Sequence, residues 1–281
     1  MKILEITVVL FFSLLLTTNF AVTAEDPTNT ITAKTSRKEA KPKITHLASP
    51  QPTHILFVGN SYFYYNDSLH NHVQRMVVAA GLFKASDLTY KSATIGGAAL
   101  FDHDINHLLN PSNLRIDKPF EVIIMQGGSA APLSERRRKR FTETAELYSS
   151  KVRATGGEPV LYMTHAYSPP HPRYDPNMIK DITSLYVDTG NRINALVIPV
   201  GLAFEEAYRR RPEISLHKSF DGTHPDMLGT YLAACTVFAS IYGVSPVGNR
   251  YDYFGEVPPE DAQFLQEVAQ YTVNRFFGRN E

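Results

Sequence analysis

The sequence ILFVGNSYFYYND, residues 55–67, decides how this chain is interpreted. Its first four residues are apolar, and a run of this length is typical of a buried strand. Gly59 and Asn60 then signal a turn, Ser61 follows, and a helix-like pattern begins a few residues later. A serine that follows a buried parallel strand exposes its hydroxyl at the carboxyl edge of the sheet, where open α/β folds place their ligand sites. We therefore predict that Ser61 is a nucleophile.

The rest of the chain alternates strand and helix patterns. The expected strands are mostly continuous apolar runs, which is typical of a parallel sheet covered by helices on both faces. They lie at residues 55–58, 88–95, 121–125, 159–163 and 195–200, and the expected helices at residues 69–80, 100–109, 134–155, 177–193, 202–210, 225–242 and 258–277. The pattern predicts an α/β fold with a five-stranded, mainly parallel sheet, in one domain from residue 54 to residue 281.

Composition limits the classes of function. The 281 residues contain 28 Lys and Arg and 28 Asp and Glu, so the formal net charge is zero. Nucleic-acid binding needs clustered positive charge, and we therefore expect no nucleic-acid partner. Cys235 is the sole cysteine and lies in an apolar helical stretch, so we expect a buried thiol and no internal disulfide.

The first 24 residues have the pattern of a signal peptide. The apolar run Ile6–Leu16 is short for a membrane span, and Val22–Ala24 offers small residues for cleavage. We expect a secreted or periplasmic protein with no membrane span after cleavage; an uncleaved anchor is the alternative. Residues 25–53 are rich in Thr, Lys, Pro and Ala, and this composition predicts a disordered linker.

A second motif could activate the serine. Asp221 and His224 are three residues apart in FDGTHPD, just before a helix with a long apolar stripe. Histidine is the best base for a serine hydroxyl near neutral pH, and a carboxylate orients it and stabilises its charged form. This spacing lets Asp221 reach one ring nitrogen of His224 while the other faces Ser61.

Together, the Gly59–Ser61 block near the domain start and the Asp221–His224 block near its end resemble the first and last blocks of the SGNH (GDSL-like) hydrolases. The resemblance covers roughly residues 54–245, although only these two blocks are specific. It implies a flavodoxin-like, three-layer α/β/α sandwich and an esterase with a Ser-His-Asp triad. In that triad, Ser61 is the nucleophile, His224 the base and Asp221 its orienting carboxylate.

The chain departs from the family pattern at two positions. Asn60 stands where the family often has Asp before the nucleophile. The third block usually supplies an Asn that donates to the oxyanion, whereas this chain has Gln126 at the end of an expected strand. The resemblance therefore implies an oxyanion hole formed by the Gln126 side chain, the Ser61 N–H and the N–H of Gly97 or its neighbour Gly96. The alternative for Gln126 is a buried amide that satisfies the sheet edge.

Acyl transfer through these residues needs no metal and no organic cofactor. We expect hydrolysis of a small-molecule or carbohydrate ester, with an acetylated carbohydrate as the favoured substrate. An O-acyltransferase with the same triad and a non-catalytic carbohydrate-binding protein are the alternatives. Tyr62, His165 and Tyr167 follow strand ends on the catalytic edge, and we predict that they contact the substrate. The alternatives are core packing for Tyr62 and ordinary loop positions for His165 and Tyr167.

Three further features have simpler interpretations. His103 and His107 have a spacing that can bind a metal, but no third ligand is evident, and a polar helix face is the favoured interpretation. The basic run Arg136–Arg140 is expected to be a solvated helix face. Asn66–Ser68 fits an N-glycosylation acceptor, which matters only in a eukaryotic secretory pathway.

Overall fold

The computed structural model of this chain describes residues 41–279. The expected signal peptide, residues 1–24, and the first part of the expected linker lie outside the described residues. Within residues 41–279, five strands form one sheet in the order β2-β1-β3-β4-β5, and every neighbouring pair is parallel. The strands are β1 (His54–Gly59), β2 (Thr89–Thr94), β3 (Val122–Gln126), β4 (Glu158–Tyr162) and β5 (Leu196–Ile198). The predicted parallel α/β sheet is confirmed.

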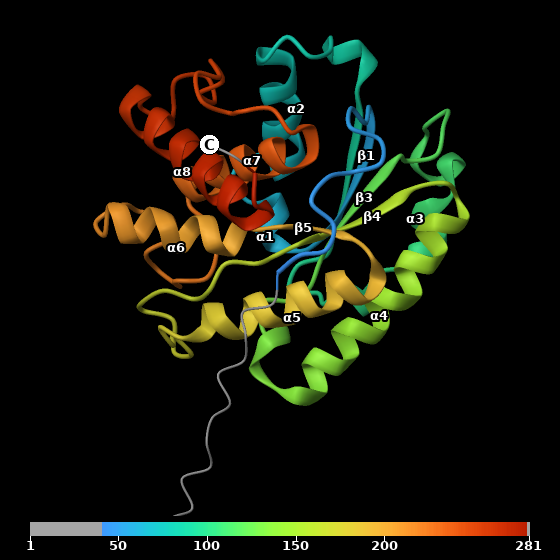
Figure 1. Cartoon of the computed structure of the whole chain (residues 1–281), viewed down its shortest axis with the longest axis horizontal. Helices are drawn as coiled ribbons and strands as arrows, with labels where there is room; N and C mark the ends of the chain where they lie inside the picture. The colour runs from blue at the N-terminus through green and yellow to red at the C-terminus, as the bar shows by residue number, and fades with distance from the viewer. Residues whose placement is uncertain (1–40, 280–281) are drawn as a thin grey trace, which may run out of the picture. The chain divides into compact units, whose positions relative to one another are not determined.

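Helices cover both faces of this sheet (Figure 1). Ile55 and Phe57 of β1 pack into a core shared with α2 (Leu69–Ala79), α6 (Val200–Arg210), α7 (Met227–Tyr242) and α8 (Pro259–Phe277). Leu56 and Val58 pack into the opposite core, shared with α3 (Ile105–Leu109), α4 (Glu135–Ala154) and α5 (Met178–Ile193). Side chains alternate between the faces of a strand, and β1 is apolar on both, so it lies buried in the middle of three layers.

Shorter helices connect these elements. The turn at residues 59–61, after β1, is called the nucleophile turn because it carries Ser61, the candidate nucleophile, and it continues as α1 (Ser61–Tyr64). The 3₁₀ turns are η1 (Ala85–Asp87), η2 (Leu100–Asp102), η3 (Pro111–Leu114) and η4 (Ala131–Leu133). The single helix expected at residues 100–109 is split into η2 and α3. The split occurs because the Asp104 carboxylate accepts from the backbone N–H groups of Asn106 and His107 and so caps a new helix.

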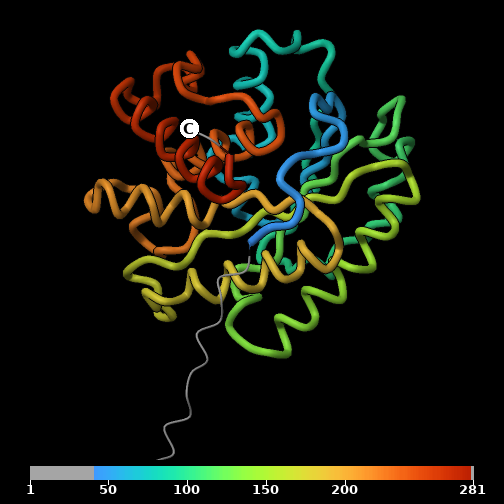
Figure 2. The backbone as a smooth tube through the Cα atoms, viewed as in Figure 1, coloured from blue at the N-terminus to red at the C-terminus, as the bar shows by residue number. Residues whose placement is uncertain are grey.

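Residues 41–53, which the composition assigns to the linker, pack against the folded unit. The backbone N–H groups of Ala48 and Ser49 donate to the Glu158 carboxylate at 3.0 and 2.9 Å. Leu47 is only 4% exposed and joins the first core. Figure 2 shows this segment in blue at the beginning of the described chain. The packed unit therefore starts before residue 54, earlier than the composition indicates.

Helix α7 is the most deeply buried helix of the described residues. Fourteen of its residues are buried, including Cys235. Burial raises the pKa of the Cys235 thiol well above its ordinary value, so this sulfur remains protonated. Across residues 41–279, no helix combines the length and apolarity that crossing a bilayer requires.

Candidate active site

The structure brings Ser61, His224 and Asp221 together at the carboxyl edge of the sheet. Ser61 is the first residue of α1, directly after β1, and its Oγ lies 2.9 Å from Nε2 of His224. The other ring nitrogen, Nδ1, lies 2.5 Å from Oδ2 of Asp221. A carboxylate can only accept, so Nδ1 carries the proton, and Nε2 accepts from the Ser61 hydroxyl. This is the arrangement that the two sequence blocks predict.

Several donors keep Asp221 ionised. Burial disfavours its charge, but hydrogen bonds from the His224 ring and from the backbone N–H groups of Thr223 and His224 outweigh this effect. Together they hold the pKa of Asp221 below its ordinary value. The side chains of Asp221 and His224 are 21% and 24% exposed, so the pair is sheltered but accessible. The imidazole therefore faces a negative charge whenever it takes a proton.

The loop that carries Asp221 and His224 is fixed from several directions. Gly222 adopts φ +64° and packs so closely that a Cβ there would lie 2.1 Å from the Ser168 carbonyl oxygen. Its own carbonyl accepts from the Ser168 N–H at 2.8 Å. On the other side, an antiparallel bridge joins His217 to Pro225. Glycine is the one residue type that fits both the positive φ at position 222 and the narrow space beside the Ser168 carbonyl.

The first residue of α7 also differs from the sequence expectation. Pro225 was expected at the first position of the helix, whereas α7 begins at Met227. Asp226 is the N-cap, and its carboxylate accepts from the Met227 N–H at 2.9 Å and from Lys218 Nζ at 2.6 Å. The cap stabilises the helix start and connects it to the strand-like segment before the loop.

The nucleophile turn is held by an amide network behind Ser61. The Asn60 side chain caps α1, with Oδ1 accepting from the Tyr62 N–H at 3.1 Å, while its Nδ2 donates to the Ala98 carbonyl at 2.9 Å. Gln126, at the end of the neighbouring strand β3, donates from Nε2 to Oδ1 of Asn60 at 2.8 Å. Asn60 therefore caps α1 and ties the turn to the loop after β2.

This geometry corrects the predicted role of Gln126. Its side chain is 1% exposed, and Nε2 donates both to Asn60 and to the Gly127 carbonyl at 3.2 Å. An amide nitrogen has two hydrogens, so none remains for an oxyanion. Gln126 therefore supports the nucleophile turn from below, contrary to the prediction that it faces the substrate.

Backbone donors are available for an oxyanion instead. Within residues 41–279, the N–H groups of Ser61 and Gly97 donate to no protein acceptor. Gly97 has φ +72° and open space where a Cβ would stand. The neighbouring Gly96 is more crowded, because a Cβ there would lie 3.3 Å from the Tyr64 hydroxyl. The prediction that Ser61 and Gly97 donate to an oxyanion is compatible with this geometry and stays a prediction.

Tyr62 and His165 lie inside the molecule, which corrects their predicted contact with substrate. Tyr62 is 4% exposed, and its hydroxyl pairs with Oγ1 of Thr223 at 2.7 Å. His165 is 1% exposed, and its ring stacks between Tyr62 and Phe204 at centroid distances of 4.2 and 4.4 Å. Its Nε2 donates to the Thr223 carbonyl at 2.8 Å. Both residues therefore support the loop next to His224.

Burial and the nearby His217 lower the pKa of His165 well below its ordinary value. The ring is therefore neutral near neutral pH, which suits its apolar stacking position. Tyr167 is also buried, at 5% exposure, and its hydroxyl donates to Ser129 Oγ at 3.1 Å. Tyr167 was predicted to contact the substrate directly. In the structure, it links the loop after β4 to the loop after β3.

Two aromatic residues of the segment after Ser61 are better placed than Tyr62. The Tyr65 ring stacks on the His224 imidazole at 4.3 Å and 15°, so it fixes the plane of that ring. Tyr64 is 42% exposed, stacks on Tyr65 and lies beside Gly96. The aromatic run YFYY, residues 62–65, is visible in the sequence. Which of its rings faces the site depends on the direction that the short helix α1 gives to each side chain.

The remaining candidates do not join this site. His103 is buried and His107 is surface-exposed, and nowhere in residues 41–279 do three metal-ligating side chains gather. The Asn66 amide, part of the glycosylation sequence, donates to the Pro225 carbonyl at 3.0 Å and to Thr230 Oγ1 at 2.8 Å. It thereby joins the segment after the nucleophile to the start of α7.

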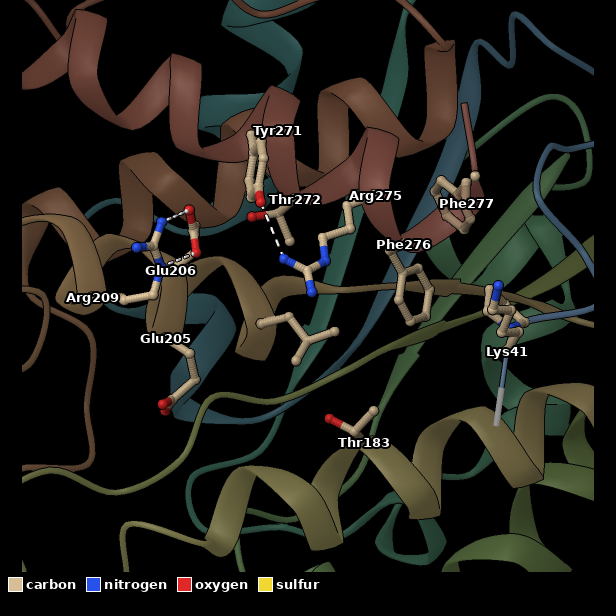
Figure 3. Close-up of a pocket in the computed structure, with 13 residues that line it drawn as sticks. Lys41, Thr183, Glu205, Glu206, Arg209, Tyr271, Thr272, Arg275, Phe276 and Phe277 are labelled. Atoms are coloured by element: carbon tan, nitrogen blue, oxygen red, sulfur yellow. Dashed lines mark hydrogen bonds and ion pairs between the residues drawn. The ribbon is translucent and has the colours of Figure 1, made fainter. Parts of the chain in front are cut away.

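A large cavity of about 700 Å³ lies away from the candidate triad (Figure 3). Its lining comes from Lys41 and from helices α5, α6 and α8, and includes Glu206, which pairs with Arg209 at 2.7 Å. None of Ser61, Asp221 and His224 lines it. The cavity therefore does not supply the substrate pocket of the triad.

No protein-family model matches this chain. No curated protein matches it either. Solved structures do match it. A DUF4886 family protein from Bacteroides uniformis is 18% identical, with 80% of this chain and 95% of that chain covered and a TM-score of 0.62. A member of the lipolytic protein G-D-S-L family from Veillonella parvula is 13% identical, with 68% and 98% covered and a TM-score of 0.51.

A third match is the acetyl xylan esterase AlAXEase, which is 12% identical, with 66% of this chain and 98% of that chain covered and a TM-score of 0.51. Identities this low establish a common fold and leave activity to be argued from the site. The strand order, the layers and these neighbours agree with one another. The chain therefore has the α/β/α fold of the SGNH hydrolases, as its first and last sequence blocks predict.

Proposed function

We propose that this chain is a serine ester hydrolase in which Ser61 attacks the ester carbonyl. One observation carries the proposal. The line of hydrogen bonds from Asp221 through His224 to Ser61 joins three residues that are up to 163 positions apart in sequence. A local capping role would explain Asp221 and His224 alone, but it would not explain why Nε2 lies 2.9 Å from the Ser61 hydroxyl.

The reaction proceeds by two acyl transfers. His224 Nε2 takes the proton as Ser61 Oγ bonds to the carbonyl carbon, and Asp221 stabilises the imidazolium that results. The tetrahedral intermediate collapses when His224 gives that proton to the departing alkoxide, which leaves as the alcohol. A water molecule, deprotonated by the same ring, then releases the acid and restores Ser61.

The negative charge of each intermediate is held by backbone donors. We assign this role to the N–H groups of Ser61 and Gly97, which have no other acceptor within residues 41–279. A preorganised donor of this kind typically lowers the barrier by about 3 to 4 kcal/mol. Gln126 contributes indirectly, because it fixes the turn from which the Ser61 N–H projects.

The substrate class follows from weaker observations. Neighbours of this fold are named for acetyl xylan esterase and lipolytic activity, which supports small acyl esters as substrates. Tyr64, exposed beside the glycine loop, offers a ring on which a sugar could stack. The N-terminal signal pattern supports action outside the cytoplasm, in a secreted or periplasmic form.

Hydrolysis of 4-nitrophenyl acetate by the purified protein tests the proposal. We expect Ser61→Ala and His224→Ala to lower kcat by about 10⁴-fold or more, because each removes the nucleophile or its base. Ser92→Ala, a serine of β2 outside the site, is the matched control and should keep the wild-type rate. Equal and negligible rates in wild type and Ser61→Ala would favour a carbohydrate-binding protein instead.

An O-acyltransferase uses the same residues but favours an alcohol over water as the acceptor. Adding a sugar acceptor to the same assay separates the two activities. Free acid as the main product supports the hydrolase, and an acylated sugar as the main product supports the transferase. Chelators should leave the rate unchanged, since the proposed steps use only protein groups.

A further inference from the structure

A second cavity lies next to the proposed oxyanion glycine. It has a volume of about 300 Å³ and is formed by the loops that follow β2 and β3 and by the first turns of α4. Gly97 is part of its lining, together with Ser129 and the ring of Phe101. A ligand in this cavity would therefore share a wall with the site where the ester carbonyl is expected.

Two sets of contacts connect this cavity to the nucleophile turn. Gly97 and Ala99 line it, and the carbonyl of Ala98 between them accepts from Asn60 Nδ2 at 2.9 Å. Asn60 directly precedes Ser61 in the chain. Ser129, also in the lining, accepts from the Tyr167 hydroxyl at 3.1 Å, which links it to the loop after β4. The cavity is thus part of the same carboxyl edge as the candidate triad.

The basic run of α4 divides into two sets. Arg138 pairs with Asp181 at 3.3 Å and Lys139 pairs with Glu143 at 3.8 Å, and neither of them lines the cavity. The other three cations do line it: Arg136, Arg137 and Arg140. Arg140 is four positions after Arg136 and three after Arg137, so it is a neighbour of each on the helix surface.

No carboxylate of the described part of the chain pairs with any of these three arginines. Arg140 is nevertheless held in place, because its guanidinium stacks over the Phe101 ring at 3.3 Å from the centroid. A stacked guanidinium keeps the N–H donors along its edge free, and these match a planar or tetrahedral oxyanion in two places. All three arginine side chains are exposed, so a ligand that enters the cavity can reach them.

We propose that this cavity binds an anionic group of the substrate, a carboxylate or a sulfate, through Arg136, Arg137 and Arg140. The inference rests on the proposed ester hydrolysis and narrows it: the substrate is an ester that carries a negative charge close to the scissile bond. The apolar part of the lining, which includes Leu100, Phe101 and Phe141, holds the carbon skeleton between the ester and that charge. The charge belongs either to the acyl group or to the alcohol.

Matched pairs of esters test this inference and distinguish the two locations. For the acyl group, mono-4-nitrophenyl glutarate is compared with 4-nitrophenyl pentanoate, which has the same chain length without the charge. For the alcohol, an O-acetylated methyl glucuronoside is compared with the corresponding O-acetylated methyl glucoside. We expect kcat/KM to favour the charged member of one pair by about tenfold or more, and to lose this preference at high ionic strength.

Variants of α4 locate the effect. Arg140→Gln and the double variant Arg136→Gln/Arg137→Gln should each remove most of the preference. The loss should arise mainly because kcat/KM falls for the charged ester, by a larger factor than for the neutral ester. Lys139→Gln is the matched control, since it removes the same charge from the same helix outside the cavity. It should retain the preference, because Lys139 does not line the cavity; an equal loss in this variant would show that general attraction of anions to the helix explains the preference.

A binding measurement makes the inference independent of catalysis. Calorimetric titration of Ser61→Ala with glutarate and with glucuronate should give a measurable dissociation constant. Adding Arg140→Gln to this variant should raise the dissociation constant by about tenfold, and adding Lys139→Gln should leave it unchanged. Equal hydrolysis of charged and neutral esters, together with no titratable binding, would overturn the anionic cavity while leaving the esterase intact. Absence of any Ser61-dependent hydrolysis with binding retained would instead overturn the esterase and keep the anion site.

Discussion

At the scale of single residues, the short contact between Ser61 and His224 depends on side chains packed behind them. Asn60 and Gln126 form a buried amide pair under the nucleophile turn, with Nε2 of Gln126 donating to Oδ1 of Asn60 at 2.8 Å. Tyr65 stacks on the face of His224 and sets the plane of the ring. The position of the hydroxyl is therefore determined by a network of neighbours, and each of them can be tested.

Replacing Gln126 by Leu distinguishes its two possible roles. The structure assigns it a supporting role, so the variant leaves the Asn60 side chain without its buried donor. We expect the free energy of unfolding to fall by about 1 to 3 kcal/mol, measured by urea denaturation. A loss of about 10² to 10³ in kcat with unchanged unfolding would instead identify Gln126 as an oxyanion donor.

Residue types, spacing and the resemblance of the two sequence blocks to the SGNH hydrolases predicted that Ser61, His224 and Asp221 would lie together. Gly59–Ser61 follows a continuous apolar strand, and Asp221 and His224 precede an apolar helix, so topology alone places them at one edge of the sheet. The role of Gln126 could not be predicted, because the sequence gives the amide but not its direction, and the side chain donates downward to Asn60 and Gly127. Likewise, an aromatic residue after the nucleophile can face inward like Tyr62 or stack on the imidazole like Tyr65.

At the scale of elements, the loop before α7 is the part of the site that must keep its shape. On one side, the Ser168 carbonyl lies so close to Gly222 that the loop has no room for a side chain there. On the other side, Asp226 caps α7 and pairs with Lys218. The loop is thus held between the turn after β4 and a helix buried in the core.

Gly222→Ala should displace this loop and with it the imidazole. A Cβ would lie 2.1 Å from the Ser168 oxygen, and the backbone would have to move by a comparable distance. We expect kcat for a short nitrophenyl ester to fall by about 10²-fold or more.

Gly243→Ala is the matched control: this glycine has a similar φ of +65° but open space around it. The control should lose about 1 to 2 kcal/mol of stability from its backbone angle and keep its kcat. A Gly222→Ala enzyme with wild-type kcat would show that the loop position is not critical.

Sequence spacing predicted most of the helices and strands, but it missed the split between η2 and α3. That split depends on a cap by Asp104, a residue whose carboxylate competes with a continuous helix.

At the scale of the whole molecule, continuous apolar runs that alternate with helix patterns predicted the sheet and its two covered faces. Strand β1 is apolar at every position from Ile55 to Val58, and the structure divides these side chains between two cores. The strand order and the packing of residues 41–53 are long-range properties. They arise from contacts such as that between Ser49 and Glu158, which no local pattern contains.

Buried neutral histidines give the molecule a predictable response to acid. Burial lowers the pKa of His217 to about 4, against 6.5 for an exposed imidazole. The unfolded chain therefore binds more protons between these values, and stability falls as the pH drops from about 6.5 toward 4. For His217 alone, the difference between these two pKa values corresponds to a loss of about 3 kcal/mol in the free energy of unfolding once the ring is protonated.

Urea denaturation at pH 7, 6, 5 and 4.5 measures this effect. His217→Gln keeps one acceptor for Tyr208 and one donor for the Ala166 carbonyl but does not titrate. We expect its stability to change less steeply with pH than that of the wild type. A wild-type protein whose stability stays constant or rises as the pH falls would contradict this account of the buried ring.

The most direct measurement of the central claim is covalent labelling of the intact enzyme with a fluorophosphonate, followed by peptide mass spectrometry. A hydroxyl activated by imidazole displaces fluoride and bonds to phosphorus, so we predict one adduct per chain, on Ser61. His224→Ala should label far more slowly at equal fold stability, because its serine has lost the base. Labelling at another serine, or no labelling of a protein whose ester hydrolysis survives Ser61→Ala, would contradict the account.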